Sequence, residues 1–477
     1  MLTEAPTTAR RMNSVSPSAI LTVLSAASFM ASLDVFIVNV AFADIARDFR
    51  GESLSSMSWV LNGYTILYAA LLVPLGRLAD RYGRKSGFLL GLGLFTAASA
   101  ACAASSGLWM LIVFRGVQAV GAAALTPTSL GLLLAATAME RRVRAVRIWA
   151  ATGALASAAG PVLGGLLVEL SWRWVFIVNV PVGVLALVLA VRMVPDSRDA
   201  AVTRTPDLVG AAQLAVAIGA LSLGLVKGSD WGWASASTIT CFAITVLGLA
   251  WFWRRSERHP LPVIEPSLLR VKPFAWANVT ALLFSVGFGA MLLSVVLWMQ
   301  ETWHYSALRT GLGVAPGPLM VPIFAAVGQR LHHRVPAGQL VALGCLLCGV
   351  GNGLVALSVG AHAGYFTEIL PGWIIAGIGV GLALPTILSA ATADLPAHRT
   401  ATGSAVVNMS RQIGLTLGVS VFVAIVGTRA GYASAHHGFQ LGWLAVVVAC
   451  VLGAITALGT TPQPVRPADS SPGSASA

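Results

Sequence analysis

The stretch Gly76-Arg77-Leu78-Ala79-Asp80-Arg81-Tyr82-Gly83-Arg84-Lys85 separates two long apolar runs, residues 59–78 and 87–105. Each run has about 20 residues, which at 1.5 Å per residue is enough to cross the roughly 30 Å hydrocarbon core of a bilayer. The stretch itself contains four cations and a single acid. The stretch is therefore predicted to be a short polar turn that joins two membrane-spanning helices.

Similar apolar runs recur along most of the chain. We place fourteen predicted spans at residues 20–43, 59–78, 87–105, 108–136, 149–169, 174–194, 208–227, 237–253, 275–299, 311–328, 339–358, 369–390, 402–427 and 439–459. Of the 477 residues, 56% are hydrophobic and only 10% are charged, whereas soluble domains have about 25% charged residues. The chain is predicted to be an all-α integral membrane protein.

Lysine and arginine are distributed unevenly between the two sides of this predicted membrane. If the N-terminus is cytoplasmic, the cytoplasmic segments hold 22 of the thirty cations and the opposite side holds six, while Arg115 and Arg411 lie inside spans. Because cytoplasmic loops carry such an excess, both termini are predicted to be cytoplasmic and the protein to be multi-pass in the cell membrane. The net charge of +12 then follows from topology, and no nucleic-acid partner is expected.

Two polar, proline-containing stretches divide the spans into three groups. We predict an N-terminal six-helix bundle (1–194), a linker with two extra transmembrane helices (195–273), a C-terminal six-helix bundle (274–460) and a disordered cytoplasmic tail (461–477). Paired six-helix bundles are a recurrent plan of transporters, whose substrate site lies near mid-bilayer between the halves.

Two opposite charges are predicted at matching depth inside the first bundle. Asp34 lies about 9 Å from the outer face along the first span, and Arg115 lies about 10 Å along the fourth span, at 1.5 Å per residue. Charges inside a membrane are costly and are commonly kept for function. Asp34 is thus a candidate proton carrier and Arg115 its partner; a static ion pair that only fixes helix packing is the alternative. Arg411, on the thirteenth span, is expected to snorkel to the cytoplasmic interface.

Two further motifs carry information. Asp80 is informative because neither the tight turn nor the excess of cations requires an acid there. In Gly160-Pro161-Val162-Leu163-Gly164-Gly165, the small residues at helical spacing predict close helix contact, and Pro161 predicts a bend. A packing kink without functional role is the alternative for this second motif.

Cysteine and tryptophan are interpreted as structural. The five cysteines lie in apolar spans and are expected to be small buried hydrophobes; the Cys345 and Cys348 pair lacks partners for a metal site. Eight tryptophans at predicted outer ends of spans are expected to form an interfacial belt, namely Trp59, Trp109, Trp172, Trp174, Trp231, Trp233, Trp298 and Trp303.

Together these motifs resemble those of the major facilitator superfamily, and within it the fourteen-helix drug:proton antiporters. Residues 76–85 resemble its loop between the second and third helices, residues 111–123 its fourth-helix motif, and residues 160–165 its antiporter motif. Segments 33–41 and 172–183 are also similar to signatures of these exporters. Phe36, Ala43 and Ala119 differ from the residues that the family often has.

The resemblance implies the major facilitator fold and roles for particular residues. Its members include methylenomycin and quaternary-ammonium resistance exporters. The implied roles are proton coupling for Asp34 and Arg115, a cytoplasmic gate for Gly76, Asp80, Arg81, Gly83 and Arg84, the antiporter motif for Gly160, Pro161, Gly164 and Gly165, and cavity lining for Asn39, Tyr64 and Gln118. The gate acid Asp80 is implied to meet the start of the thirteenth span, near residues 400–404.

The sequence therefore predicts a proton-coupled antiporter that exports small toxic organic compounds by alternating access, driven by the proton gradient without a cofactor or metal. Its partners are the small-molecule substrate, protons and the lipid bilayer; no motif identifies an adaptor protein. With one deep acid, a monovalent cation or a neutral amphiphile is the expected substrate. Export of an endogenous metabolite, such as a self-made antibiotic or siderophore, is the alternative. A membrane enzyme or receptor is disfavoured because no histidine pairs with acids near a membrane surface.

Overall fold

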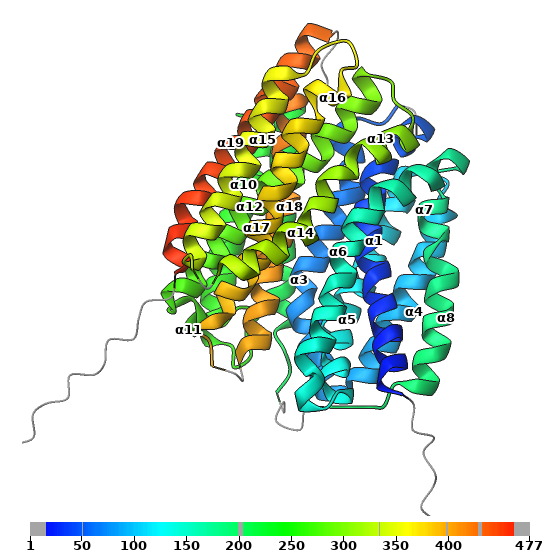
Figure 1. Cartoon of the computed structure of the whole chain (residues 1–477), viewed down its shortest axis with the longest axis vertical. Coiled ribbons are helices and arrows are strands. Elements are labelled where there is room, and N and C mark those ends of the chain that lie inside the picture. The colour runs from blue at the N-terminus through cyan, green and yellow to red at the C-terminus, as the bar shows by residue number, and fades with distance from the viewer. Residues whose placement is uncertain are drawn as a thin grey trace, which may run out of the picture.

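The computed structural model describes residues 16–49, 51–198, 204–332, 334–396, 399–427 and 432–461. Within these residues, fourteen helices are long and apolar enough to span a membrane, and none of the regular elements is a strand. The prediction of fourteen spans is confirmed, and the protein is an all-α, multi-pass membrane protein. The first span begins and the last span ends at the lower end of the molecule in Figure 1. The predicted tail beyond Thr461 lies outside the described residues.

The first six spans are the blue-to-cyan helices of Figure 1. They are α1 (Pro17–Asp48), α3 (Trp59–Tyr82) preceded by the short α2 (Leu54–Met57), α4 (Arg84–Ala103), α5 (Leu108–Ala136), α6 (Met139–Leu170), and α8 (Asn179–Met193) preceded by the short α7 (Trp174–Ile177). Helix α1 packs against α5, α6 and α8, and α5 packs against α3 and α4. The helices that carry Asp34 and Arg115 are therefore neighbours.

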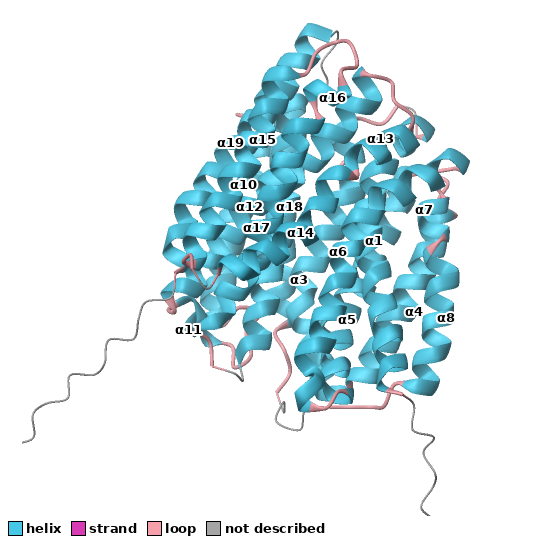
Figure 2. Cartoon of the chain, in the orientation of Figure 1, coloured by secondary structure: helices cyan, strands magenta, loops and turns pink. Residues whose placement is uncertain are grey.

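The last six spans stand beside them. They are α12 (Lys272–Leu297) extended by the π-helical turn η1 (Trp298–Thr302), α13 (Ala307–Val314) followed by α14 (Pro316–Leu331), α15 (Ala337–Ser358), α17 (Leu370–Ala393) preceded by α16 (Tyr365–Glu368), α18 (Thr400–Val426), and α19 (Tyr432–Ala457) followed by η3 (Leu458–Thr460). Helix α12 packs against α18 and α19, and α15 packs against α17 and α19. Figure 2 shows that short loops join these helices.

Small residues let helices approach closely in this second group. A Cβ atom added to Gly344 of α15 would lie 2.7 Å from the carbonyl oxygen of Gly379 on α17, so only glycine fits there. Lipid is as apolar as leucine and gives no hydrophobic drive for helix association, so van der Waals packing of small residues takes its place.

The two extra helices are α9 (Leu208–Trp231) and α10 (Ala236–Arg258), followed by the short α11 (Pro266–Leu269). Helix α9 packs against both α3 and α18, whereas α10 packs mainly on α9. Arg255 Nε donates to Asp207 Oδ1 at 2.7 Å, which joins the start of α9 to the end of α10. The extra hairpin therefore lies along the seam between the two groups of six spans.

The two groups contact each other at one end of the molecule. We call the end where α1 ends and α3 begins the predicted outer end; it is the top of Figure 1. Among the described residues, four hydrogen bonds join the groups directly: Asn62 to Ser420, Thr65 to Thr416, Gln300 to the Val40 carbonyl, and the Leu308 amide to Glu169. All four lie in the predicted outer half, so the seam is closed there.

Two sequence expectations need correction. Helix α6 begins at Met139, ten residues before the predicted start of the fifth span at 149. The added turns carry Arg141, Arg142, Arg144 and Arg147. A helix can continue beyond the hydrocarbon layer, where its cations meet water. The length of an apolar run does not reveal this extension.

The predicted tryptophan belt is only partly present. Trp109, Trp174, Trp231 and Trp233 are exposed as expected, but Trp172, Trp298 and Trp303 are buried. Trp298 packs against the rings of Phe439, Trp443 and His436 at 5.1 to 5.5 Å between centroids. For these buried residues the prediction was wrong, since packing against neighbouring helices and not the interface determines their position.

Candidate functional site

Asp34 and Arg115 form a buried ion pair between α1 and α5. Arg115 Nη1 lies 2.5 Å from Asp34 Oδ2, and the two side chains are 1% and 0% exposed. The structure thus brings together the two charges that the sequence places at matching depth, although 81 residues separate them. Burying both charges is tolerable only because each is paired and hydrogen-bonded.

Two amides complete the donor set around Asp34. Gln118 Nε2 donates to Asp34 Oδ1 at 2.9 Å, and Asn179 Nδ2 donates to the same oxygen at 3.1 Å. Gln118 Nε2 also donates to Ser99 Oγ at 2.8 Å. The sequence reasoning missed Ser99 and Asn179 as site residues; the available signal was an asparagine at the start of an apolar span.

Aromatic and backbone groups hold the guanidinium of Arg115. Its Nε donates to the Val60 carbonyl at 3.2 Å, and its Cζ lies 4.1 Å from the centroid of the Tyr64 ring. Tyr64 in turn stacks on Tyr68, with 6.0 Å between ring centroids and an 8° angle between planes. The hydroxyl of Tyr64 is buried without a hydrogen-bond partner.

The three residues predicted to line a cavity have different surroundings. Tyr64 and Gln118 are buried in the shell of the ion pair. Asn39 is partly exposed on α1, and its Nδ2 donates to the Val35 carbonyl of the same helix at 2.8 Å. That these residues line a transport cavity stays a prediction.

The hydrogen bonds around Asp34 depend on the charge of its carboxyl group. The three donors facing Asp34 match the ionised carboxylate, which accepts hydrogen bonds at both oxygens. Protonation of Asp34 would remove the charge partner of Arg115 and replace one acceptor by a donor, so the network would have to rearrange. The groups that would rearrange come from five helices, α1, α3, α4, α5 and α8.

The polar turn between α3 and α4 is held by two ion pairs. Arg84 Nε lies 2.6 Å from Asp80 Oδ1, and Gly83 has φ +129°, a backbone conformation that favours glycine. Arg77 Nη2 lies 2.8 Å from Glu265, and its Nη1 donates to the Pro262 carbonyl at 2.6 Å. The sequence did not predict this contact between Arg77 and the segment that follows α10.

The other predicted gate residues lie in the same turn. Gly76 is close to Pro127 of α5, where an added Cβ would lie 3.0 Å from the proline Cβ. The guanidinium of Arg81 lies 5.0 Å from the ring centroid of Tyr82. No hydrogen bond or ion pair of the described residues joins Asp80 to the start of α18, so that contact stays a prediction.

The motif of residues 160–165 packs in two directions. A Cβ atom added to Gly160 would lie 2.6 Å from Phe36 Cβ, and Gly164 faces Ile37, so both glycines face α1. Gly165 instead faces α13, where an added Cβ would lie 2.6 Å from the Ala307 carbonyl oxygen. The motif is therefore part of the closed seam between the two groups of spans.

The expectation that Arg411 snorkels to the interface was wrong. Arg411 lies eleven residues beyond Thr400, the first residue of α18, which is about 16 Å along the helix at 1.5 Å per residue. Its Nη1 donates to Asn408 Oδ1 at 3.0 Å, and its Nε is buried without a partner. The cation is therefore held within the helix bundle.

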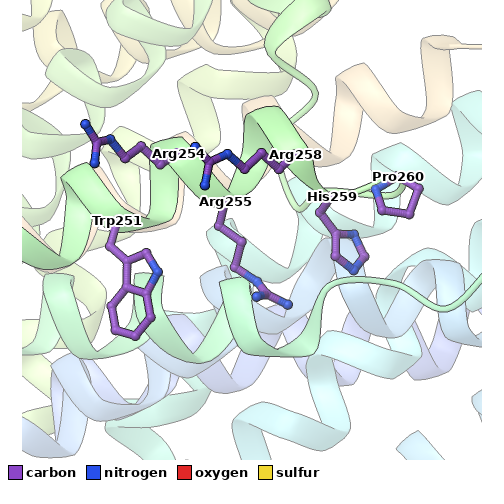
Figure 3. Close-up of a pocket in the computed structure, with 6 residues that line it drawn as sticks. All are labelled: Trp251, Arg254, Arg255, Arg258, His259 and Pro260. Atoms are coloured by element: carbon purple, nitrogen blue, oxygen red, sulfur yellow. The ribbon is translucent and has the colours of Figure 1, made fainter.

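A surface pocket of about 440 Å³ lies at the end of α10. It is lined by Trp251, Arg254, Arg255, Arg258, His259 and Pro260, which follow one another along the helix and the turn after it (Figure 3). None of the residues predicted for transport lies in this pocket, so we do not regard it as the transport site.

Comparisons with known proteins give consistent results. Residues 24–207 and 208–419 match the model of the Major Facilitator Superfamily. The chain is 33% identical to the methylenomycin A resistance protein of Bacillus subtilis, over 91% of this chain and 93% of that protein. It is 34% identical to the multidrug resistance protein Stp of Mycobacterium tuberculosis, over 83% of this chain and 74% of that protein.

Other relatives and solved structures extend this similarity. The chain is 32% identical to the probable actinorhodin transporter of Streptomyces coelicolor, over 86% of this chain and 73% of that protein. A POT family transporter in complex with 5-aminolevulinic acid superposes with a TM-score of 0.68 at 16% identity, over 93% of this chain and 96% of that one. At that identity the superposition shows a shared fold alone.

Proposed function

The chain belongs to the major facilitator superfamily of membrane transporters, and we propose that it is a proton-coupled antiporter that exports small toxic organic compounds across the cytoplasmic membrane. Its relatives are named for methylenomycin A resistance and multidrug resistance, which supports export of drugs and antibiotics. In this proposal both termini are cytoplasmic, and the domain boundaries are those predicted from the sequence.

The single observation that carries the proposal is the ion pair of Asp34 and Arg115. A buried carboxylate needs hydrogen bonds whatever its role, but a pair that only fixed helix packing could be replaced by two well-packed apolar residues of similar volume, which would serve at least as well. Here the side-chain amides of Gln118 and Asn179 both donate hydrogen bonds to Asp34. The chain thus keeps an ionisable carboxyl group at membrane depth and surrounds it with groups that respond to its protonation.

Alternating access gives this carboxyl group its role. In the state described, the two groups of spans are joined at the predicted outer end. A proton reaches Asp34 when the outer end opens, weakens its bonds to Arg115 and the amides, and leaves to the cytoplasm after the seam closes outside. Substrate moves the opposite way through the same alternation. The proton gradient supplies the energy for transport. A proton or a ligand shifts the equilibrium between the two states only by the difference between its affinities for them.

The test uses everted membrane vesicles and a compound to which an overexpressing strain is resistant. Asp34→Asn keeps the shape of the side chain but cannot ionise, so proton-driven transport is expected to be lost while membrane insertion is kept. Glu140→Gln, which neutralises an exposed acid at the start of α6, is the matched control and should transport normally. Wild-type transport by the Asn variant, with its usual response to a proton gradient, would overturn the proposal.

A second candidate is the export of an endogenous metabolite by the same mechanism. It is supported by the relative named as a probable actinorhodin transporter. Finding biosynthetic genes next to the gene of this protein, and loss of secretion of their product on deletion, would favour it. A resistance phenotype without any change in secreted products would favour drug export.

A further inference from the structure

Arg411 is a cation inside a membrane span without an acidic partner. Among the described residues, no carboxylate lies within ion-pair distance of it. Tyr68, on α3, is the ionisable residue that is close enough to Arg411 to interact with it electrostatically. Arg115, by contrast, is fully paired. Because an unpaired charge inside a membrane span is costly and such charges commonly mark functional sites, Arg411 calls for a functional explanation.

The guanidinium presents one unused edge. Its Nη1 is bonded to Asn408, while Nε is buried without a partner and Nη2 has no hydrogen bond within the described part of the chain. The Nε and Nη2 donors form the side of a guanidinium that binds a carboxylate with two parallel hydrogen bonds. The contact with Asn408 therefore holds Arg411 in place without using this edge.

Polar neighbours of Arg411 lie on the same face of α18. Asn408 lies three residues before Arg411 and four residues before Gln412, the spacing of neighbours on a helix surface, whereas Gln412 directly follows Arg411. All three side chains are partly exposed, whereas Met409 and Ile413, which are adjacent to Asn408 and Gln412 in the sequence, are buried. The Oε1 atom of Gln412 is also buried without a partner. This face has more hydrogen-bonding capacity than the protein itself uses.

The facing helix offers no free acid. Helix α18 meets α3 through Thr416 and Thr65, and Tyr68 lies one turn further from the predicted outer end on α3. Tyr68 stacks on Tyr64, which lies on Arg115, and Asp34 is enclosed by three donors. A cationic substrate would therefore find no available carboxylate here, whereas an anionic group could pair with the unpartnered Nε and Nη2 donors of Arg411.

We propose that Arg411 binds a carboxylate or comparable anionic group of the exported compound, so that organic acids are the preferred substrates. Asn408 orients the guanidinium. This inference rests on the proposed function as an exporter and replaces the expectation of a cationic substrate drawn from Asp34. In this proposal the anionic group of the substrate binds on α18, whereas the proton binds to Asp34 at the ion pair between α1 and α5. The stacked rings of Tyr64 and Tyr68 lie between these two sites.

The test compares binding of matched acids and amides to the purified protein without a proton gradient. The probes are amphipathic aromatic carboxylic acids and their primary amides, led by anthraquinone-2-carboxylic acid and anthraquinone-2-carboxamide. The acid should bind more tightly to the wild type than the amide. Arg411→Gln, which keeps a polar side chain but removes the charge and the guanidinium, should weaken acid binding by about tenfold to a hundredfold, as expected for loss of hydrogen bonds to a charged group, and leave amide binding unchanged.

Controls separate this site from general effects of charge and folding. Arg330→Ala removes an exposed cation near the end of α14 and should leave acid binding as in the wild type. Arg411→Lys should retain part of the acid preference, because the charge stays and the fork is lost. Equal binding of acid and amide by the wild type, binding of neither, or an equal loss of both in Arg411→Gln would overturn the proposal.

The outcome for the proposed function is read separately. If Asp34→Asn abolishes proton-driven export but acids show no preference, the exporter remains and the acid site is rejected. If acids bind through Arg411 but no protein-dependent transport occurs in vesicles, the binding site remains and the exporter is rejected.

Discussion

The guanidinium carbon of Arg115 lies 4.1 Å from the centroid of the Tyr64 ring, so the cation that pairs with Asp34 also rests on an aromatic face. This face, the carboxylate and the Val60 carbonyl hold the guanidinium from three directions. The pair is therefore fixed by the shape of its surroundings as well as by charge.

Arg115→Lys should lower transport roughly tenfold without abolishing it. Lysine keeps the positive charge, but it cannot donate at once to Asp34, Gln118 and Val60 as the planar guanidinium does. Initial transport rates in everted vesicles, normalised to protein amount, measure the effect. Full activity of the lysine variant would argue against a role for the guanidinium geometry.

Tyr64→Phe should leave transport within about twofold of the wild type and should not reduce thermal stability. The hydroxyl that it removes is buried without a partner, and such a group stabilises the fold little or not at all. Tyr64→Leu removes the aromatic face and should cost about 0.5 to 2 kcal/mol of cation–π interaction. Thermal unfolding of both purified variants provides the comparison, and equal midpoints would show that the ring contact contributes nothing.

Gly165→Ala should disfavour the state that is closed at the predicted outer end. The added methyl group would meet the Ala307 carbonyl oxygen across the seam, and overpacking of this kind costs about 1 to 3 kcal/mol. Gly153→Ala is the matched control on the same helix, since its nearest contact would be 4.0 Å from Ser32 Oγ. A spin-label distance between Glu52 and His362, both exposed near the outer end, should lengthen in the first variant alone.

Asp80→Asn should shift the population by a modest factor towards the state that is open to the cytoplasm. The start of α18 carries unpaired N–H groups and about half a positive charge, worth roughly 0.3 to 1 kcal/mol to a nearby anion. In the present state Asp80 bonds Arg84 instead, so we expect the latch contact only when the cytoplasmic side closes. Spin labels at Tyr82 and Thr402 report the distance between the turn that carries Asp80 and the start of α18. If this distance is the same in the wild type and in Asp80→Asn, and the same in the states open to either side, the latch is rejected.

Ser229→Cys should react with an impermeant thiol reagent added to intact cells. Ser229 is exposed in the last turn of α9, next to the turn that leads into α10, and this turn is predicted to lie outside. The five native cysteines are buried and should not react. Labelling that requires permeabilised cells would place this hairpin on the cytoplasmic side.

The sequence alone determined the fourteen spans and the matching depth of Asp34 and Arg115 in the membrane. A span is visible in sequence because lipid cannot satisfy backbone or side-chain polar groups, so each crossing segment must be a long apolar helix. The rise per residue then fixes the depth of a charge within its own helix. Both properties are local, and no knowledge of neighbouring helices is needed to read them.

Only the tertiary structure decided which groups surround these charges. Asn179, Ser99 and Tyr64 reach the ion pair from three other helices, Arg77 pairs with Glu265 across 188 residues, and Arg411 stays in the bundle. An isolated helix would let Arg411 extend to the interface, and an isolated span would leave Trp298 at the membrane surface. Helix packing decides otherwise, because it sets the space and the partners available to each side chain, and these depend on residues far away in the chain.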